Sequence, residues 1–323
     1  MERFDLTDFA KLAETLRRPF QTSYYAMYSS VYGGVVTDPV LMMLPMDDHM
    51  VHRGDGVFEA FKAVDGNIYN LQAHLDRLQE SADGLALRMP VATGRLKEIV
   101  LATARAGGRR DGMIRVFVSR GPGGFSVNPY ECPAAQLYVV VTAVATPFMR
   151  LHPEGARLRS SSVPAKSAGM AVIKNCNYAP NVLMKKEAVD SGVDYAVGFD
   201  ENGFLTEGAT ENIGIVTADR RLLFPRLDRI LHGTTMLRVM ALAEQTARTG
   251  ELTAVTFADV TRRDMLAAAE ILITGTTINI AAAVELDGAR IDDGRPGPVF
   301  RKLSGLLERD MQTNTALLTP VFG

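Results

Sequence analysis

The chain has 323 residues, 47% apolar and 22% charged, with a formal net charge of −2. This length allows two domains, the composition is that of an ordinary globular protein, and the near-neutral charge lacks the basic footprint of nucleic-acid binding. Two cysteines, Cys132 and Cys176, give neither a disulfide framework nor zinc spacing. With no signal-peptide layout and no run of about 18 apolar residues, we expect a cytoplasmic protein without a membrane span.

The N-terminal half is predicted to mix helices and strands. Apolar residues at helical spacing predict a helix over 5–18, and Asp65-Gly66 predicts a hairpin turn. Gly107-Gly108 is expected to close a helix. The other expected elements are a strand over 35–44 interrupted by Asp38-Pro39, strands over 57–64, 67–70, 113–119 and 136–144, and helices from Leu71 and over 96–106.

The second half follows a stretch rich in Pro, Gly and Ser, Ala145–Ala171, which indicates an interdomain linker and an edge strand. Irregularly mixed strands and helices predict an α+β protein. The expected strands are 195–199, 213–217 and 270–274, and the expected helices are 180–190, 234–249 and 298–311. The expected parts are a helical N-terminal extension (1–22), a small domain (23–145), a linker (146–160) and a large domain (161–323).

Lys174 and Glu207 are the main candidates for chemistry. Lys174 follows the apolar pair Val172-Ile173, and a desolvated lysine becomes a usable nucleophile. On local sequence alone, a lysine at a strand end with its ammonium in water is the commoner case. Glu207 lies between Leu205 and Gly208-Ala209, which suggests a partly buried carboxylate, although most glutamates lie on the surface. A lysine amine and a carboxylate are the two groups that pyridoxal phosphate chemistry needs.

Two threonine-rich turns could bind a phosphate, because backbone amides and hydroxyls at a helix start favour anions. One is Leu231–Thr235, before the helix expected from 234, and the other is Thr274–Thr277. Arg77 could add a charged donor. The alternatives are helix capping by the threonines and, for Arg77, a surface salt bridge with Asp76 or Glu80.

Two further segments are not assigned a ligand. The loop Arg120–Gly124 lacks the ending of a phosphate loop and the dinucleotide fingerprint, so we interpret it as a mobile loop near a pocket. Asp47-Asp48-His49 with His52 more often caps turns than binds metal. We therefore predict no metal site.

Together these segments resemble the fold-type IV pyridoxal phosphate enzymes: D-amino acid transaminases, branched-chain aminotransferases and aminodeoxychorismate lyases. The similarity runs from about Tyr28 to about Asp310, and it is closest to the plant plastid D-amino acid transaminases and their bacterial relatives. Four segments carry it in order, namely Arg53–Glu59 through His74–Leu78, Ile173-Lys174 through Asn181–Leu183, Thr206–Gly208, and Gly233–Thr235 with Gly275–Thr277.

The resemblance implies a small N-terminal α/β domain, a larger barrel-like C-terminal domain, and a homodimer with the cofactor between the domains. Lys174 would hold pyridoxal 5′-phosphate as an internal aldimine and move the substrate's Cα proton. Glu207 would pair with the pyridine nitrogen and Tyr178 with the phenolic oxygen. The implied phosphate ligands are Arg77, Thr234, Thr235, Thr276 and Thr277. Amino acid and 2-oxo acid substrates would react by ping-pong kinetics.

Within this family the segment Val57–Lys62 favours a D-amino acid transaminase acting on D-alanine or D-glutamate. It lacks the threonine typical of the lyases, but Phe58 replaces the usual tyrosine, and 121–130 lacks the usual Arg and His. Arg115 or Arg120 could bind the substrate carboxylate instead, with Phe58 and Lys62 as further substrate contacts. Arg115 also keeps a branched-chain L-amino acid aminotransferase open as the alternative, with aminodeoxychorismate lyase as the second.

Overall fold

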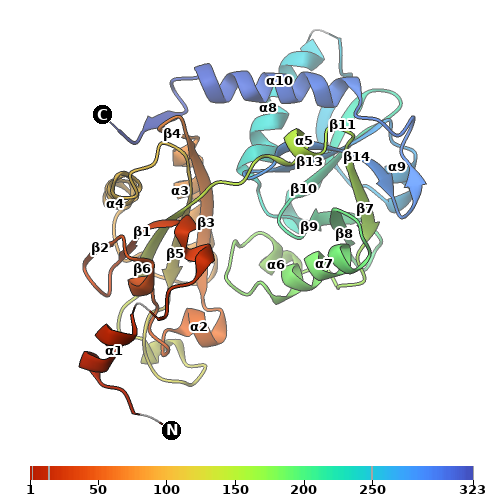
Figure 1. The fold of residues 1–323 in the computed structure, drawn as a ribbon. Helices are drawn as coiled ribbons and strands as arrows, with labels where there is room; N and C mark the ends of the chain where they lie inside the picture. The colour runs from red at the N-terminus through yellow and green to blue at the C-terminus, as the bar shows by residue number, and fades with distance from the viewer. Residues whose placement is uncertain (2, 14, 249, 323) are drawn as a thin grey trace.

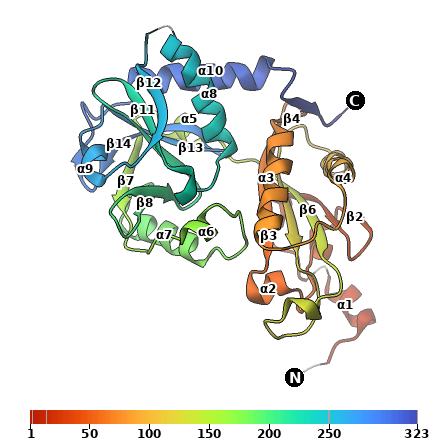
Figure 2. The same cartoon turned by 180° about the vertical axis from the view of Figure 1, so that it is seen from behind.

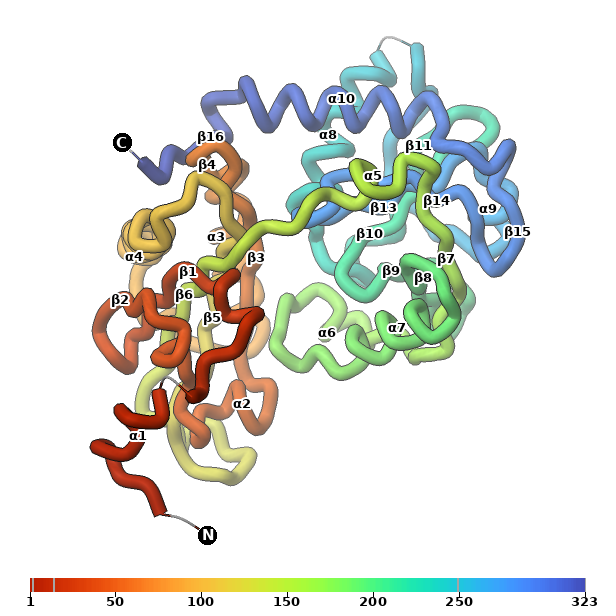
Figure 3. Tube along the Cα trace, in the orientation of Figure 1, coloured from red at the N-terminus to blue at the C-terminus, as the bar shows by residue number. Residues whose placement is uncertain are grey.

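A computed structural model describes residues 1, 3–13, 15–248 and 250–322. Two β-sheets with their helices lie next to each other (Figure 1). An extended segment between β6 and α5 carries the chain from one to the other (Figure 3). Both helices and strands therefore contribute to each half, as the predicted α+β class requires. Among the described residues, no helix has the length and apolar character needed to cross a bilayer.

The first sheet has seven strands in the order β16-β4-β3-β5-β6-β1-β2, and all neighbouring pairs are antiparallel. Apolar residues of α3 (Leu71–Gly84) and α4 (Thr93–Ala106) pack against one face of it, with α3 lying along the strands in Figure 2. The strands are β1 (Tyr24–Ser29), β2 (Gly34–Val36), β3 (Gly56–Val64), β4 (Asn67–Tyr69), β5 (Gly112–Ser119), β6 (Gln136–Thr142) and β16 (Leu318–Pro320).

Strand β3 matters most for function because its two faces serve different purposes. Successive side chains on a strand point to opposite faces. Val57 and Phe61 belong to the core beneath α3 and α4. Phe58 and Lys62 therefore lie on the opposite face, which contacts the second half of the chain.

The second sheet has nine strands and closes on itself, because β9 pairs with both β8 and β10. Ile213 and Ile273 belong to the core enclosed by it, whereas Leu272 packs outward with residues of α8 and α10. The strands are β7 (Ala156–Ser160), β8 (Tyr195–Phe199), β9 (Leu205–Gly208), β10 (Asn212–Val216), β11 (Arg221–Pro225), β12 (Ala254–Ala258), β13 (Glu270–Gly275), β14 (Asn279–Leu286) and β15 (Ala289–Arg290).

Most predicted elements are confirmed within one to three residues, but the two most N-terminal ones are wrong in extent. The helix expected over 5–18, of which residue 14 lies outside the described residues, is observed only over Leu6–Leu12, and none of these seven residues is buried. The strand expected over 35–44 is only β2, followed by a 3-10 turn. Residue 249, the last of one expected helix, lies outside the described residues. The helices are α1 (Leu6–Leu12), α2 (His49–Arg53), α5 (Phe148–Leu151), α6 (Ala168–Ala171), α7 (Ala179–Asp190), α8 (Thr234–Arg248), α9 (Arg262–Leu266) and α10 (Pro298–Thr313).

The expected domain boundaries remain a prediction, and two segments depart from them. β7 begins at Ala156, inside the expected linker, and pairs with β14 and β8 of the second sheet. After α10 the chain returns to the first half, where β16 pairs with β4 (Figure 3). The last strand therefore belongs to the sheet of the small domain, although the sequence placed it in the large one.

Candidate active site

Lys174 lies in the loop between α6 and α7, and main-chain hydrogen bonds attach this loop to the first half of the protein. Phe58 N donates to Lys174 O at 2.9 Å, and Lys174 N donates to Ser81 Oγ of α3 at 3.1 Å. The preceding Ile173 is buried in the core under the first sheet. Burial of Ile173 and these two bonds fix where the Lys174 side chain starts.

The Lys174 amine is poised for nucleophilic chemistry. Its Nζ lies 4.6 Å from the centroid of the Phe58 ring, which meets the Tyr178 ring edge-on at 5.2 Å between centroids. Burial, and next the positive charge of Arg77, lowers the pKa of Lys174 to about 8. A neutral lysine amine is the reactive form, so a useful fraction exists near neutral pH.

Glu207, on β9, faces the same region from the second sheet. Its Oε2 accepts from Leu231 N at 3.1 Å and from Asn212 Nδ2 at 3.5 Å. Asn212 Nδ2 also donates to Leu231 O at 3.0 Å, and a Cβ on Gly233 would come within 1.9 Å of Asn212 Oδ1. Burial raises the pKa of Glu207, although the charges of nearby lysines oppose this.

A buried network links Arg77 to the start of α8. Glu59 is fully buried and accepts from Arg77 Nε at 2.6 Å, Arg77 Nη2 at 2.8 Å and His74 Nδ1 at 2.7 Å. Burial alone would raise the pKa of Glu59, but Arg77 and His74 outweigh it and lower that pKa well below its usual range. Burial lowers the pKa of His74, so its neutral ring donates to Glu59 and can accept from Thr234 Oγ1 at 3.2 Å.

The start of α8 has the donors that a phosphate requires. Arg77 Nη1 donates to His232 O at 2.9 Å, which places the guanidinium at the segment that leads into α8. The first N–H groups of a helix lack acceptors within the helix, and the helix dipole favours an anion there. A guanidinium, hydroxyls and free N–H groups at one helix start form an anion site.

Thr276 and Thr277 lie in the turn between β13 and β14. Gly275 and Asn279, on either side of this turn, pair with each other in the sheet. Asn279 has φ +62, the left-handed conformation common after such three-residue turns. Its Oδ1 accepts a hydrogen bond from Lys62 Nζ on β3. The turn is therefore attached to the first half of the protein as well as to its own sheet.

Three of the four predicted substrate contacts share one face of the first sheet. Ala60 pairs with Arg115 in the β3–β5 register, so Arg115 lies on the same face as Phe58 and Lys62. Arg115 Nη1 donates to Thr142 Oγ1 at 3.1 Å. Lys62 is 7% exposed, and burial lowers its pKa to about 8.

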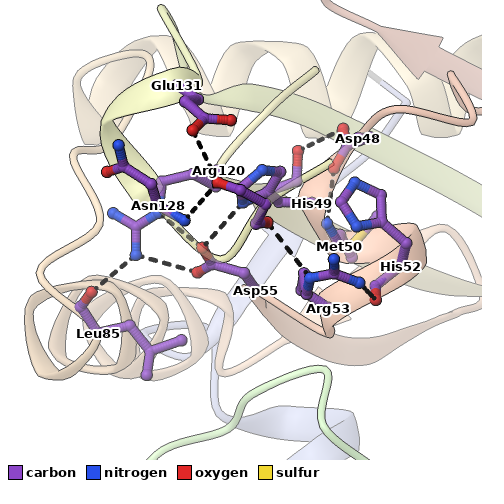
Figure 4. A network of polar contacts seen from close by, with 12 residues as sticks. Asp48, His49, Met50, His52, Arg53, Asp55, Leu85, Arg120, Asn128 and Glu131 are labelled. Atoms are coloured by element: carbon purple, nitrogen blue, oxygen red, sulfur yellow. Dashed lines mark hydrogen bonds and ion pairs between the residues drawn. The ribbon is translucent and has the colours of Figure 1, made fainter. Parts of the chain in front are cut away.

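Arg120, the fourth, points elsewhere (Figure 4). It donates to both carboxylate oxygens of Asp55, at 2.9 and 3.0 Å. It also donates to Leu85 O at 3.0 Å and to Ala86 O at 2.9 Å. These contacts engage its guanidinium beside the end of α3, so we do not retain Arg120 as a substrate contact.

The acidic and histidine cluster of the sequence holds a loop in place. Asp48 caps α2 by accepting from Met50 N at 2.9 Å, and it also accepts from Ser119 Oγ and Tyr138 OH at 2.7 and 2.8 Å. His49 Nε2 contacts Gly124 O at 2.8 Å, and Figure 4 shows Asp48 and His49 in one network of polar residues. The capping interpretation is confirmed for Asp48. In the described ranges no group of three or more His, Cys, Asp or Glu residues could hold a metal ion.

Sequence reasoning missed four polar residues that the structure places at the site: Glu59, His74, Asn212 and Lys166. The sequence did indicate a role for Glu59. It lies between Val57 and Phe61 on the core face of a strand, and a carboxylate buried there needs a partner. His74 lies one helical turn before Arg77. Asn212 and Lys166 carry no such local signal, because the contacts of Asn212 with Leu231 and of Lys166 with Tyr178 depend on how the chain folds.

The residues present fit pyridoxal phosphate. Lys174 offers a reactive amine, Glu207 a half-buried carboxylate for a ring nitrogen, and Arg77 with Thr234 an anion site. A larger hollow of about 740 Å³ lies elsewhere, between the turn after β10 and the start of α10, and none of these residues lines it. We therefore place the active site where the two sheets meet.

The fold and these groups define a pyridoxal phosphate-dependent aminotransferase of fold type IV. The sequence profile of the family Amino-transferase class IV matches residues 56–286, and the chain belongs to this family. Its cofactor is pyridoxal 5′-phosphate. The family was predicted from the sequence, and the comparison confirms it.

Relatives of two specificities resemble the chain. It is 38% identical to the chloroplastic D-amino-acid transaminase of Arabidopsis thaliana, over 90% of this chain and 77% of that protein. It is 29% identical to the branched-chain-amino-acid aminotransferase of Pseudomonas aeruginosa, over 79% and 83%. The structure also matches that of a branched-chain amino acid aminotransferase from T.th. complexed with N-(5′-phosphopyridoxyl)-L-glutamate, with a TM-score of 0.83, 26% identity, and 93% and 99% coverage.

Proposed function

We propose that this aminotransferase moves the amino group of a D-amino acid, such as D-alanine or D-glutamate, to a 2-oxo acid by ping-pong kinetics. The observation that carries this proposal is the 38% identity, over 90% of the chain, to a D-amino-acid transaminase. The sequence Gly54–Lys62, similar to that of D-amino acid transaminases, supports it. 2-Oxoglutarate is the acceptor we expect.

The residues around Lys174 would each have a defined task. Pyridoxal phosphate, when bound, supplies a ring that accepts electrons from the substrate Cα. The Lys174 amine would hold the cofactor and, once free and neutral, would take up the Cα proton. Glu207 would bind the ring nitrogen, and Tyr178 would donate a hydrogen bond to the phenolic oxygen. Burial raises the pKa of Tyr178 far above its usual value, so its hydroxyl remains a donor.

Phosphate binding would involve both halves of the protein. Arg77 extends from α3 to the start of α8, where Thr234 and Thr235 offer hydroxyls and N–H groups. The turn with Thr276 and Thr277 would bind from the other side. A phosphate bound by all of these would hold the two sheets together.

Arg115 is our candidate for the substrate carboxylate. It lies on the same face of the first sheet as Phe58 and Lys62, and its guanidinium suits a two-point contact with a carboxylate. Phe58 can only form an apolar wall, since it has no hydroxyl. Arg115→Met should raise KM for both 2-oxoglutarate and pyruvate, because each carries a carboxylate beside its carbonyl. Arg110→Met, in the exposed segment just before the same strand, is the control and should change neither.

A branched-chain L-amino acid aminotransferase is the second candidate. The similarity to the Pseudomonas aeruginosa enzyme and to the solved branched-chain structure and the place of Arg115 on β5 favour it. Aminodeoxychorismate lyase is a weaker third, because Glu59-Ala60 stand where the lyases typically carry a threonine.

A homodimer and a cytoplasmic location belong to the same proposal. Phe125, Val127 and Tyr130 are 61%, 80% and 92% exposed on the loop after β5, and apolar side chains exposed together favour a protein contact. A dimer mass from light scattering on a sizing column would support the assembly. A monomer at micromolar concentration would contradict it.

The decisive experiment mixes purified holoenzyme separately with D-alanine, D-glutamate, L-leucine and aminodeoxychorismate, without an acceptor, and follows the cofactor absorbance. Conversion to the aminated cofactor by the D-amino acids alone supports the proposal. Conversion by L-leucine alone refutes it in favour of the branched-chain enzyme. Pyruvate release from aminodeoxychorismate would identify a lyase.

A further inference from the structure

Lys166 is a third lysine at the site, besides Lys174 and Lys62. It lies in the segment between β7 and α6, and it is half-buried. Its Nζ is 5.3 Å from the centroid of the Tyr178 ring. A cation over an aromatic face is attracted to it. Lys166 therefore contacts a residue that we expect to bind the cofactor.

Lys166 and Glu207 also line the same hollows. Two hollows of about 20 Å³ each are lined by Lys166, Glu207 and Asn181, and one of them also by Lys174 and Tyr178. A third hollow, of about 520 Å³ and more open to solvent, is lined by Lys166 but not by Glu207. Lys166 thus stands between the outer hollow and the carboxylate.

Asn181 shows that the small hollows are polar. It is 5% exposed, and its Nδ2 donates to Ala209 O. Within the described part of the chain its Oδ1 is buried without a hydrogen-bond partner. Each hollow has room for about one water. A water there would have Lys166 as donor and Asn181 Oδ1 and Glu207 as acceptors, which connects the two charges.

The charges around Glu207 and Lys174 show how Lys166 influences the protonation of both groups. Lys166 and Lys174 favour the ionised form of Glu207, and Glu211 opposes it. Around the Lys174 amine, Arg77 and Lys166 disfavour the protonated form, while Glu59 and Glu207 favour it. The positive charge of Lys166 therefore favours the ionised carboxylate of Glu207 and the neutral amine of Lys174. On the outer side, Arg229, Asp200 and Glu201 also face Lys166 across the larger hollow.

We infer that Lys166 is a positioning residue of the cofactor site, whose positive charge holds Glu207 as a carboxylate and Lys174 as a neutral amine. These are the forms that bind a ring nitrogen and react with a carbonyl. The inference rests on the roles given to Lys174 and Glu207 in the proposed function. It does not depend on which amino acid is the substrate.

The test measures the protonation of Lys174 directly in the full-length protein after cofactor removal. Acetic anhydride labels neutral amines, and mass spectrometry of the peptide containing Lys174 gives the labelling rate from pH 6 to 10. In Lys166→Met we expect the midpoint to rise by at least about half a pH unit, a threefold slower labelling at pH 7. Lys166→Arg should retain the wild-type midpoint.

Lys185 provides the matched control. Its Nζ lies 5.5 Å from the centroid of the Tyr195 ring and donates to Asp194 O at 2.9 Å, a similar contact outside the site. Lys185→Met should leave the Lys174 midpoint unchanged. In the holoenzyme, the pH titration of cofactor absorbance should move upward in Lys166→Met and not in Lys185→Met.

Each outcome decides the inference. An unchanged midpoint in Lys166→Met overturns it, and so does a shift in Lys166→Arg as large as in the methionine variant, because charge would then not be the cause. If Lys166→Met does not fold, Lys166→Gln is measured in the same way. A shifted midpoint in a protein that fails to use D-amino acids would refute the proposed substrate and leave this inference standing.

Discussion

Glu59→Ala is the most informative single change, because it breaks a buried ion pair and leaves the rest of β3 in place. Glu59 is fully buried, and Arg77 is only 7% exposed. Removing the carboxylate leaves the guanidinium with one hydrogen bond, to His232 O, and leaves His74 Nδ1–H without its acceptor. An unpaired buried charge typically costs about 3–5 kcal/mol. We expect the free energy of unfolding to fall by about that amount.

The stability lost in Glu59→Ala should become smaller as the pH falls. Arg77 and His74 lower the folded-state pKa of Glu59 below its ordinary value of 4.5. The wild-type contribution is therefore fully present above pH 4.5 and is lost as the pH falls below it. The difference between wild type and Glu59→Ala should thus be constant from pH 6 to 7 and shrink in more acidic solution.

Urea unfolding of the cofactor-free protein, followed by circular dichroism, measures this difference. Glu98→Ala is the matched control, because Glu98 pairs with Arg95 at 2.8 Å with both side chains more than 60% exposed. Such surface pairs contribute about 0.2–1 kcal/mol. Should the two variants lose equal stability at pH 7, the reasoning about the buried pair is refuted.

Three further changes test other parts of the structure. Lys174→Ala should abolish covalent attachment of pyridoxal phosphate on borohydride reduction, measured by protein mass; attachment at an unchanged level would place the reactive lysine elsewhere. Lys62→Met removes the hydrogen bond to Asn279 Oδ1 and should weaken cofactor binding about tenfold, as measured by equilibrium dialysis. Lys62→Arg should weaken binding less. Equal binding in both variants and the wild type would contradict this role. Gly214→Ala would place a Cβ 2.7 Å from the Phe224 ring and should cost about 1–3 kcal/mol in urea unfolding, and a neutral result would show that the ring can move away.

The sequence predicted those elements whose pattern is local. β3, β8 and α7 combine suitable propensity with clear boundaries, such as the Asp65-Gly66 turn after β3. The helix expected over 5–18 had the same apolar spacing, yet α1 ends at Leu12 and buries none of its described residues. Spacing indicates which face could be buried, but it does not show whether another surface lies opposite.

Non-local pairing explains the other differences. β16 has only three residues, and its pairing with β4 brings together Leu318 and Tyr69, which are far apart in the sequence. No local pattern specifies such a partner. At the site, by contrast, Lys174 and Glu207 could be proposed from their sequence neighbours. The position of Lys166 beside Tyr178 and Glu207 is visible only in the structure.

The two reactive groups come from different halves of the protein, which has consequences for stability. Lys174 is attached to β3 and α3 through Phe58 and Ser81, whereas Glu207 is on a strand of the closed sheet. Bound pyridoxal phosphate would contact both, and a ligand that binds only the assembled form stabilises it. Glu59 acts within the first half, but Lys62 connects the two halves. Loss of Glu59 should therefore destabilise the cofactor-free protein most, and loss of Lys62 should show mainly in cofactor affinity.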